Sequence, residues 1–287
     1  MSKYVVLYNP FSANGTGAAK AEELKETLSE HELRFENITK IGDLKAYFDA
    51  LPEDENPVIA GGDGTLWYLV NFVDCDHDLN RDIYYMPCGS GNDFYCDVKE
   101  QETELPFVVN KYLKDLPIVT VKGKDYKVLN GVGFGIDGYC CEEADKMKKV
   151  SDKPVNYTSI AIKGMLYDYK PTNAAITVDG IEYTFRKAWL VPTMNGRYYG
   201  GGMNAAPNQD RLNEKGTLST MLFHGSGRIP TLITFPNIFK GTHVNAKCVT
   251  VLTGRDITVT FDRPTALQID GETFLGVTTY RMRSVKG

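Results

Sequence analysis

A glycine-rich segment with a single acid occupies residues 61–65, in the order Gly61, Gly62, Asp63, Gly64 and Thr65. Glycine reaches backbone conformations closed to other residues and leaves no side chain between the backbone and an approaching phosphate. The Asp63 carboxylate is suited to holding Mg²⁺ through water or to orienting a hydroxyl group. A purely structural turn does not need an acid among three glycines, so the segment favours phosphate chemistry.

A second loop of small residues opens with Asn9, Pro10, Phe11, Ser12 and Ala13 and ends in two further glycines before residue 18. Small residues allow the backbone to wrap around an anion, and a helix after the loop offers unsatisfied N–H groups and a positive dipole end. An ordinary strand-to-helix turn explains this loop equally well when it is taken alone.

A third glycine-rich loop, at residues 87–94, contains Ser90, Asn92 and Asp93. Ser90 is able to donate to a phosphate, whereas Asn92 and Asp93 can bond a phosphate, a ribose or the loop itself, or cap a helix. Three such loops at the ends of successive predicted strands are harder to dismiss than one. Together they predict a phosphate-binding edge.

The elements that position these loops alternate between strand and helix. This order predicts a parallel sheet with covering helices, and ligands collect at the carboxyl ends of such strands. The expected strands are 3–8, 33–39, 57–60 and 83–86, and the expected helices are 18–30, 43–51 and 65–73, the last opened by Thr65.

The pattern changes after about residue 120, where short strands are separated by glycine and polar turn residues. This pattern of strands and turns predicts an antiparallel sandwich or barrel interrupted by one helix at 138–149. We therefore expect two domains, 1–121 and 122–287, with the extreme C-terminus free to return to the first. The expected strands are 118–121, 126–132, 174–178, 183–191, 218–223, 246–253 and 256–261.

Composition excludes several classes of protein. The net charge is −5 and the pI is near 5.5, which argues against a nucleic-acid partner. No apolar run approaches the roughly 18 residues of a membrane-spanning helix. The six cysteines form no Cys-x-x-Cys pair, which is typical of reduced thiols in the cytoplasm.

Three sequence signatures of other nucleotide-binding proteins do not apply. The chain has no Gly-x-x-x-x-Gly-Lys-Ser/Thr motif and no protein-kinase motif. Residues 133–138 match a dinucleotide-binding fingerprint, but they lie where the chain has become mostly β. We interpret them as a close-packed glycine turn.

The three loops together resemble the diacylglycerol kinase catalytic family, which includes bacterial lipid kinases and sphingosine kinases. NAD kinases and phosphofructokinases share the 61–65 pattern, and the 87–94 loop favours lipid kinases. The resemblance implies an NAD-kinase/phosphofructokinase-like α/β N-terminal domain, a C-terminal antiparallel β-sandwich and an active site in the cleft between them. It continues through residues 130–137, 200–203, 206–207, 241–243 and 270–272.

The same resemblance implies the site residues and the cofactors, ATP and Mg²⁺. It makes Glu272 the catalytic base, with Asp63 nearby in the water and Mg²⁺ network. Taken alone, residues 270–272 are equally a hairpin turn, since Asp-Gly is favoured there. The expected nucleotide contacts are Asn9, Pro10, Phe11, Ser12, Ala13, Thr39, Gly61, Gly62, Asp63, Gly64, Thr65, Ser90, Asn92 and Asp93.

The sequence departs from the family pattern in two ways. Ala13 stands where glycine is usual and Ser90 where threonine is usual, and both changes are small. Between Leu212 and Thr217, where many bacterial members hold a structural Mg²⁺ with two acids, Leu212 and Lys215 replace them. A lysine ammonium opposes a hard cation, so we predict that this metal site is absent and that Lys215 supplies the charge.

We therefore expect an ATP-dependent kinase that phosphorylates a lipid hydroxyl, with diacylglycerol converted to phosphatidic acid. The alternatives are another acceptor, such as a sphingoid base, an isoprenoid or NAD, or an inactive regulator that binds lipid or nucleotide. The expected partners are the lipid and, transiently, the inner face of the membrane; a homodimer is left open. A basic stretch at 145–153 followed by an apolar one at 157–167 suits contact with a lipid, or equally a solvated helix face followed by core.

Overall fold

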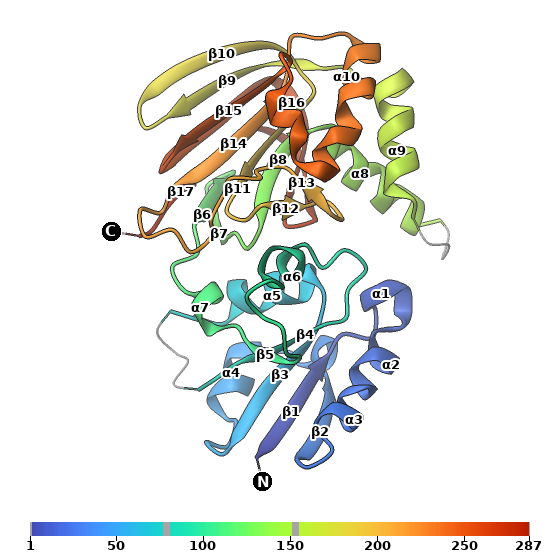
Figure 1. The fold of residues 1–287 in the computed structure, drawn as a ribbon, viewed down its shortest axis with the longest axis vertical. Coiled ribbons are helices and arrows are strands. Elements are labelled where there is room, and N and C mark those ends of the chain that lie inside the picture. The colour runs from blue at the N-terminus through green and yellow to red at the C-terminus, as the bar shows by residue number, and fades with distance from the viewer. Residues whose placement is uncertain (1, 77–80, 151–154, 287) are drawn as a thin grey trace. The chain divides into compact units, whose positions relative to one another are not determined.

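The structure, a computed structural model, describes residues 2–76, 81–150 and 155–286. Its chain forms two compact units, Met1–Leu116 (unit 1) and Pro117–Gly287 (unit 2), each of which is described by itself (Figure 1). The sequence places the boundary after residue 121, and the structural division falls after Leu116. Lys153, part of the expected basic stretch, lies outside the described residues.

Unit 1 contains one sheet with the strand order β2-β1-β3-β4-β5. Its four longer strands pair in parallel, which confirms the α/β fold predicted from the sequence, and β5 adds an antiparallel edge. The side chains of Val5, Val6 and Leu7 are fully buried, because helices cover both faces of the sheet. The strands are β1 (Lys3–Tyr8), β2 (Glu32–Asn37), β3 (Glu55–Gly61), β4 (Tyr84–Pro87) and β5 (Phe107–Val108).

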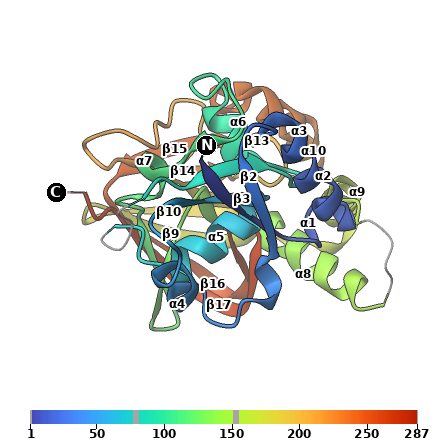
Figure 2. The ribbon, with the colours of Figure 1, turned by 90° about the horizontal axis from the view of Figure 1, so that it is seen from below.

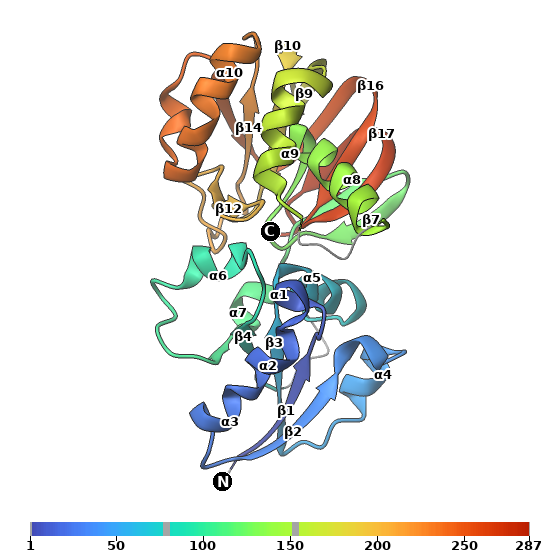
Figure 3. The same cartoon turned by 90° about the vertical axis from the view of Figure 1, so that its right-hand side faces the viewer.

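The helices of unit 1 are short, with α2 and α3 on one face of the sheet and α4 and α5 on the other (Figures 2 and 3). The expected helix 18–30 is divided in two at Glu23. The expectation that Thr65 opens a helix is wrong: α5 begins at Asp63, because Gly62 is already the extended N-cap residue. The helices are α1 (Ser12–Gly15), α2 (Gly17–Glu22), α3 (Leu24–Thr27), η1 (Ile38–Lys40), α4 (Leu44–Asp49), α5 (Asp63–Phe72), α6 (Asp93–Val98) and α7 (Asn110–Leu113).

Unit 2 is built on a large antiparallel sheet, as the sequence predicts. The path runs β15-β14-β11-β8-β16-β17-β6-β7, and β9 and β10 attach beside it. The long strand β16 pairs with β9 through residues 257–261 and with β8 through residues 267–269, so its two halves have different neighbours. Its strands are β6 (Ile118–Val121), β7 (Lys124–Lys127), β8 (Gly131–Gly135), β9 (Thr172–Val178), β10 (Ile181–Ala188), β11 (Leu190–Met194), β14 (Leu218–Phe223), β15 (Val249–Gly254), β16 (Asp256–Ile269) and β17 (Glu272–Arg283), with β12 (Tyr198–Tyr199) and β13 (Met203–Asn204) apart.

The helices of unit 2 gather on one side of its sheet (Figures 1 and 3). They cover a core in which Trp189, Phe223 and Ile238 are each at most 2% exposed. Among the described residues, no helix combines the length and apolar character that crossing a bilayer requires. These helices are α8 (Ile136–Lys148), α9 (Tyr157–Lys163), η2 (Gly164–Asp168), α10 (Arg228–Thr234), η3 (Phe235–Lys240) and η4 (Thr242–Asn245).

The glycines of residues 133–138 serve close packing, which confirms their interpretation as a structural turn. A Cβ atom on Gly135, whose φ is +109°, would lie 2.3 Å from the carbonyl oxygen of Trp189. A Cβ atom on Gly138 would lie 2.1 Å from the carbonyl oxygen of Ala266. Both pairings of β8 within the described residues are antiparallel, so these residues form no βαβ unit around the turn.

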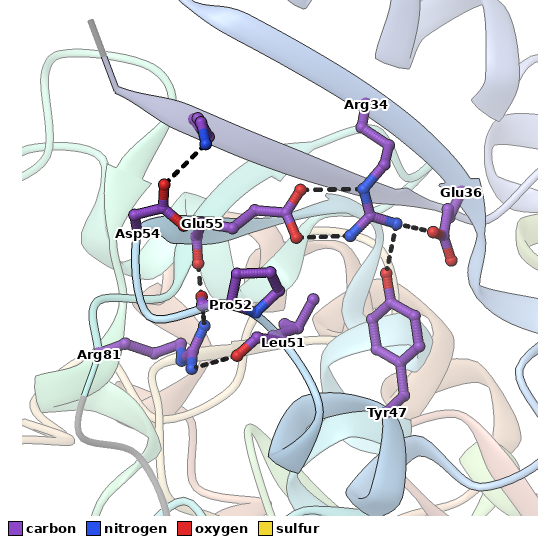
Figure 4. A network of polar contacts seen from close by, with 9 residues as sticks. Arg34, Glu36, Tyr47, Leu51, Pro52, Asp54, Glu55 and Arg81 are labelled. Carbon is purple, nitrogen blue, oxygen red and sulfur yellow. Dashed lines mark hydrogen bonds and ion pairs between the residues drawn. The ribbon is translucent and has the colours of Figure 1, made fainter.

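A polar network around Arg34 holds β2, β3 and α4 together (Figure 4). The Arg34 Nε donates to Glu55 Oε1 at 2.9 Å, and its Nη1 donates to the Tyr47 hydroxyl at 3.1 Å. Glu36 also forms an ion pair with Arg34. Arg81 donates to the Glu55 carbonyl oxygen at 3.0 Å. The Glu55 carboxylate raises the pKa of the guanidinium above its ordinary value.

Replacing Arg34 with methionine should lower the free energy of unfolding by about 2 kcal/mol, because the nearly buried Glu55 carboxylate loses its partner. The measurement is urea unfolding of the purified variant. Lys45→Met is the matched control, since the Lys45–Asp49 pair is about half exposed and should contribute little. Equal losses in the two variants would contradict a special role for Arg34.

Candidate active site

Three glycine-rich loops follow the carboxyl ends of β1, β3 and β4 and therefore lie at one edge of the parallel sheet of unit 1. We call them loop A (residues 9–17), loop B (61–65) and loop C (87–94). Loops B and C touch through their backbones, since a Cβ on Gly89 would lie 2.6 Å from the Cα of Gly62. A side chain at either glycine would push the two loops apart.

Asp63 joins loop B to the start of α6. Its Oδ2 accepts the backbone N–H of Asp93 at 2.9 Å, and its Oδ1 accepts that of Phe94 at 2.7 Å. These are N–H groups that the first turn of a helix leaves without intrahelical partners, and their positive dipole end favours a carboxylate. Because each carboxylate oxygen has a second acceptor site, this coupling is compatible with contact to water or a metal.

Asn92 shapes loop C from within. Its backbone is left-handed, with φ of +50°. Its Oδ1 accepts the N–H of Gly89 at 2.8 Å, and its Nδ2 donates to the carbonyl oxygen of Gly89 at 3.0 Å. Asp93 is buried in the first turn of α6, whereas Ser90 is exposed. Of these three residues, Ser90 is the one whose side chain faces solvent.

Asn9 joins loop A to loop B. Its Nδ2 donates to Thr65 Oγ1 at 3.2 Å, and its Oδ1 accepts the N–H of Phe11 at 3.0 Å. Ala13 adopts a φ of +50°, a conformation that glycine reaches without cost, so this departure from the family pattern carries strain. The Phe11 side chain is exposed beside the loop.

Thr39 stands at the same edge of the sheet, just after β2. The Asn37 side chain accepts its backbone N–H at 3.0 Å and its hydroxyl at 2.7 Å. Unit 1 thus brings every predicted nucleotide contact to one edge: Asn9, Pro10, Phe11, Ser12, Ala13, Thr39, Gly61, Gly62, Asp63, Gly64, Thr65, Ser90, Asn92 and Asp93.

Glu272 belongs to unit 2, where it is the first residue of β17. It follows a tight turn in which Asp270 and Gly271 have φ of +47° and +93°. The Asp270 carboxylate accepts three successive backbone N–H groups, those of residues 129–131, at 2.6, 2.7 and 2.9 Å. Asp270 therefore fixes the turn that presents Glu272.

The surroundings of Glu272 disfavour its charged form. Although Glu272 is exposed at the start of β17, desolvation by the protein around its carboxyl raises the pKa, and the negative charge of Asp145 raises it further, while Lys148 opposes both. Both charged neighbours belong to α8, which packs against β17. A raised pKa suits a carboxylate that must take a proton and then release it.

The expected role of Lys215 in the 210–217 loop stays a prediction, and its side chain is exposed. A different lysine, Lys286, bonds this loop directly. Its Nζ donates to the carbonyl oxygen of Asn213 at 2.8 Å and to that of Arg211 at 3.3 Å. The absence of a structural Mg²⁺ between Leu212 and Thr217 stays a prediction.

Sequence reasoning missed two residues that support the site. The Tyr85 hydroxyl donates to the carbonyl oxygen of Gly61 at 3.1 Å, and Gln268 accepts the N–H of Gly271 at 2.8 Å. Neither belongs to a recognisable motif, because each acts through a partner that only the fold brings close.

Comparisons with known proteins agree with this arrangement. Residues 3–119 match the family model "Diacylglycerol kinase catalytic domain", and residues 130–285 match "YegS C-terminal NAD kinase beta sandwich-like domain". A relative named "Putative lipid kinase YtlR", from Bacillus subtilis, is 24% identical over 247 residues, covering 79% of this chain and 76% of the relative.

Two further matches extend this picture. A protein named "Diacylglycerol kinase", from Mycobacterium tuberculosis, is 26% identical over 65% of this chain and 60% of its own length. The crystal structure of "a putative diacylglycerol kinase from Bacillus anthracis" matches 99% of this chain and 93% of its own, with a TM-score of 0.68 and 18% identity, which shows a common fold. The chain therefore belongs to the diacylglycerol kinase catalytic-domain family of lipid kinases, with a C-terminal domain of the YegS type.

Proposed function

We propose that this protein transfers the γ-phosphate of ATP to a lipid hydroxyl, with diacylglycerol as the acceptor and phosphatidic acid as the product. The observation that carries the proposal is the coupling of loops A, B and C by Asn9 and Asp63. Phosphoryl transfer depends mainly on positioning and charge stabilisation, which a set of rigidly joined glycine loops provides.

The loops fit the phosphate chain of a nucleotide. A Cβ on Gly15 or Gly64 would meet no atom within 4 Å, so the backbone there is open to a close approach. Ser90 is exposed and able to donate to a phosphate oxygen. Asp63 would help to hold Mg²⁺ through water, and the metal would neutralise charge on the phosphates.

Glu272 is the proposed general base. Its carboxylate would accept the proton of the lipid hydroxyl as the oxygen attacks the γ-phosphorus, and ADP would leave with the bridging oxygen. Asp270 acts as a positioning residue, since its carboxylate accepts three backbone N–H groups and so holds the turn before Glu272.

The test is transfer of radiolabelled phosphate from ATP to a panel of acceptors. We expect labelled phosphatidic acid from diacylglycerol in mixed micelles. Preferential labelling of a sphingoid base, an isoprenoid alcohol or NAD would replace the proposed acceptor. Nucleotide binding without transfer to any acceptor would indicate an inactive regulator.

The acid limb of the pH–rate profile should respond to the charges on α8. Activity requires the ionised Glu272 carboxylate, so it falls as the pH drops through a pKa that lies above the ordinary value. Asp145→Asn removes a negative charge, lowers that pKa and should shift the limb to lower pH. Lys148→Met removes the opposing positive charge and should shift it to higher pH. A profile of kcat/KM checks both signs, and shifts in the same direction would contradict the assignment.

A further inference from the structure

The segment formed by α10 and η3 in unit 2 is apolar on two opposite sides. On its inner side, Leu232, Phe235 and Ile238 pack into the core that contains Trp189 and Phe223. The outer side nevertheless carries further large apolar residues, with Ile229 68%, Ile233 72% and Phe239 47% exposed. A helix that is apolar all round is normally enclosed on every side, which is not the case for the isolated chain.

The outer residues follow the spacing of the two helices. Ile229 and Ile233 are four positions apart on α10, which places them on one side of that α-helix. Pro236 and Phe239 are three positions apart on the 3-10 helix η3, where such residues share a side, and Lys240 is the last residue of η3. All five residues are exposed. These five residues are called the α10 face below.

A neighbouring element carries a further exposed aromatic residue. η2 packs against α10 and presents Tyr167 at 72% exposure. α9 leads directly into η2, and Figure 3 shows α9 running beside α10. The exposed Lys163 of α9 forms an ion pair with Asp168, so this edge carries one acid beside one base. Two elements in contact thus each expose large apolar side chains.

The stretch of sequence that carries the α10 face contains no acidic residue. Between Glu214 and Asp256 the sequence contains neither Asp nor Glu, although the whole chain has a net charge of −5. Lys240 and Lys247 are exposed, and within the described part of the chain neither forms an ion pair. The basic residues of this acid-free stretch are Lys215, Arg228, Lys240, Lys247 and Arg255.

We propose that the α10 face docks on an anionic lipid bilayer. Ile229 and Ile233 would enter the boundary between headgroups and acyl chains, and Lys240 and Lys247 would lie among the lipid phosphates. A second copy of this chain fits less well, because pairing two such faces would bring cations together. The inference rests on the proposed action on a lipid, for which it names the surface where the enzyme meets its substrate.

Vesicle co-sedimentation of the full chain tests this proposal without ATP or an acceptor, so its result is independent of the proposed kinase activity. Vesicles consist of phosphatidylcholine alone or mixed with phosphatidylglycerol. We expect binding to the mixed vesicles. The double variant Ile229→Ser/Ile233→Ser should weaken it about tenfold or more, through lost apolar burial. Lys240→Gln and Lys247→Gln should each weaken it about fivefold.

Ile181→Ser is the matched control, because Ile181 is 61% exposed on β10 and lies outside the α10 face. Circular dichroism establishes that each variant is folded. Equal binding by the double variant and the control, or equal binding to both vesicle types, would overturn the proposal. Analytical ultracentrifugation adds a further outcome: loss of a dimer in the double variant, with vesicle binding unchanged, would assign the face to self-association instead.

Discussion

Glu272→Gln is expected to lower the rate of phosphate transfer by about 10²- to 10⁴-fold, the usual effect of removing a general base. The amide has the shape of the carboxylate but does not accept the proton of the attacking hydroxyl. Nucleotide binding should survive, since the loops of unit 1 are unchanged. Single-turnover transfer and equilibrium ATP binding, measured on the same preparation, check the two halves of this expectation.

The chain contains a close control for that variant. Asp179, Gly180 and Glu182 stand in the β9–β10 hairpin, where Asp179 and Gly180 have φ of +48° and +86°, much like the turn before Glu272. The Asp179 carboxylate also accepts two backbone N–H groups, at 2.9 Å each. Glu182→Gln should therefore leave transfer unchanged. Near-normal turnover in Glu272→Gln would remove Glu272 from the mechanism.

Asp63→Asn is expected to weaken ATP binding by about 10- to 100-fold, the value of one hydrogen bond to a charged group, and to lower transfer further. The neutral amide accepts only through one oxygen, whereas Asp63 accepts from both Asp93 and Phe94. Loop B should therefore separate from α6. Calorimetric titration with ATP measures the loss.

Two comparisons separate the structural from the metal-binding role of Asp63. If Asp63 couples the loops, the affinity for nucleotide should fall in Asp63→Asn even with EDTA present; a loss confined to solutions with Mg²⁺ would limit the residue to metal binding. Asp43→Asn is the control, since Asp43 caps α4 through the N–H of Ala46 at 2.9 Å but joins no glycine loop. An equal loss of affinity in that variant would contradict the coupling.

The local sequence was sufficient to predict the first and last residues of a strand where that strand is defined by its own side chains. β1, β6 and β14 begin and end at the predicted residues, because each is a short run of apolar or β-branched residues. The expected strand 126–132 divides into β7 and β8, because the N–H groups of residues 129–131 donate to Asp270 instead of to a neighbouring strand. That partner lies 139 or more positions away.

The predicted end of a strand at residue 261 was wrong for a similar reason. Arg263 and Pro264 follow, and a proline ordinarily ends a strand because it lacks the N–H donor. β16 passes through Pro264 because the pairing with β17 shifts register between Thr260 and Thr265. At this irregularity the strand does not need the N–H donor that proline lacks. The irregularity is visible only in the pairing of β16 with β17, so the local sequence did not predict it.

The candidate site also has one part that the local sequence predicts and another part that it does not. The glycine motifs identified the residues of loops A, B and C, since each motif is local. They did not reveal that Asp63 bonds the first turn of α6 or that Lys286 reaches the 210–217 loop, because these contacts depend on the tertiary fold.

The pairing of β16 with both β9 and β8 has a consequence for how the protein folds during synthesis. β8 pairs with β11 along one edge and with residues 267–269 of β16 along the other. During synthesis one edge of β8 thus stays open until nearly the whole chain has left the ribosome, and such late, distant pairings fold slowly and expose the chain to aggregation. The segment that closes this edge is followed immediately by Glu272, so the proposed base takes its place only as the sandwich is completed.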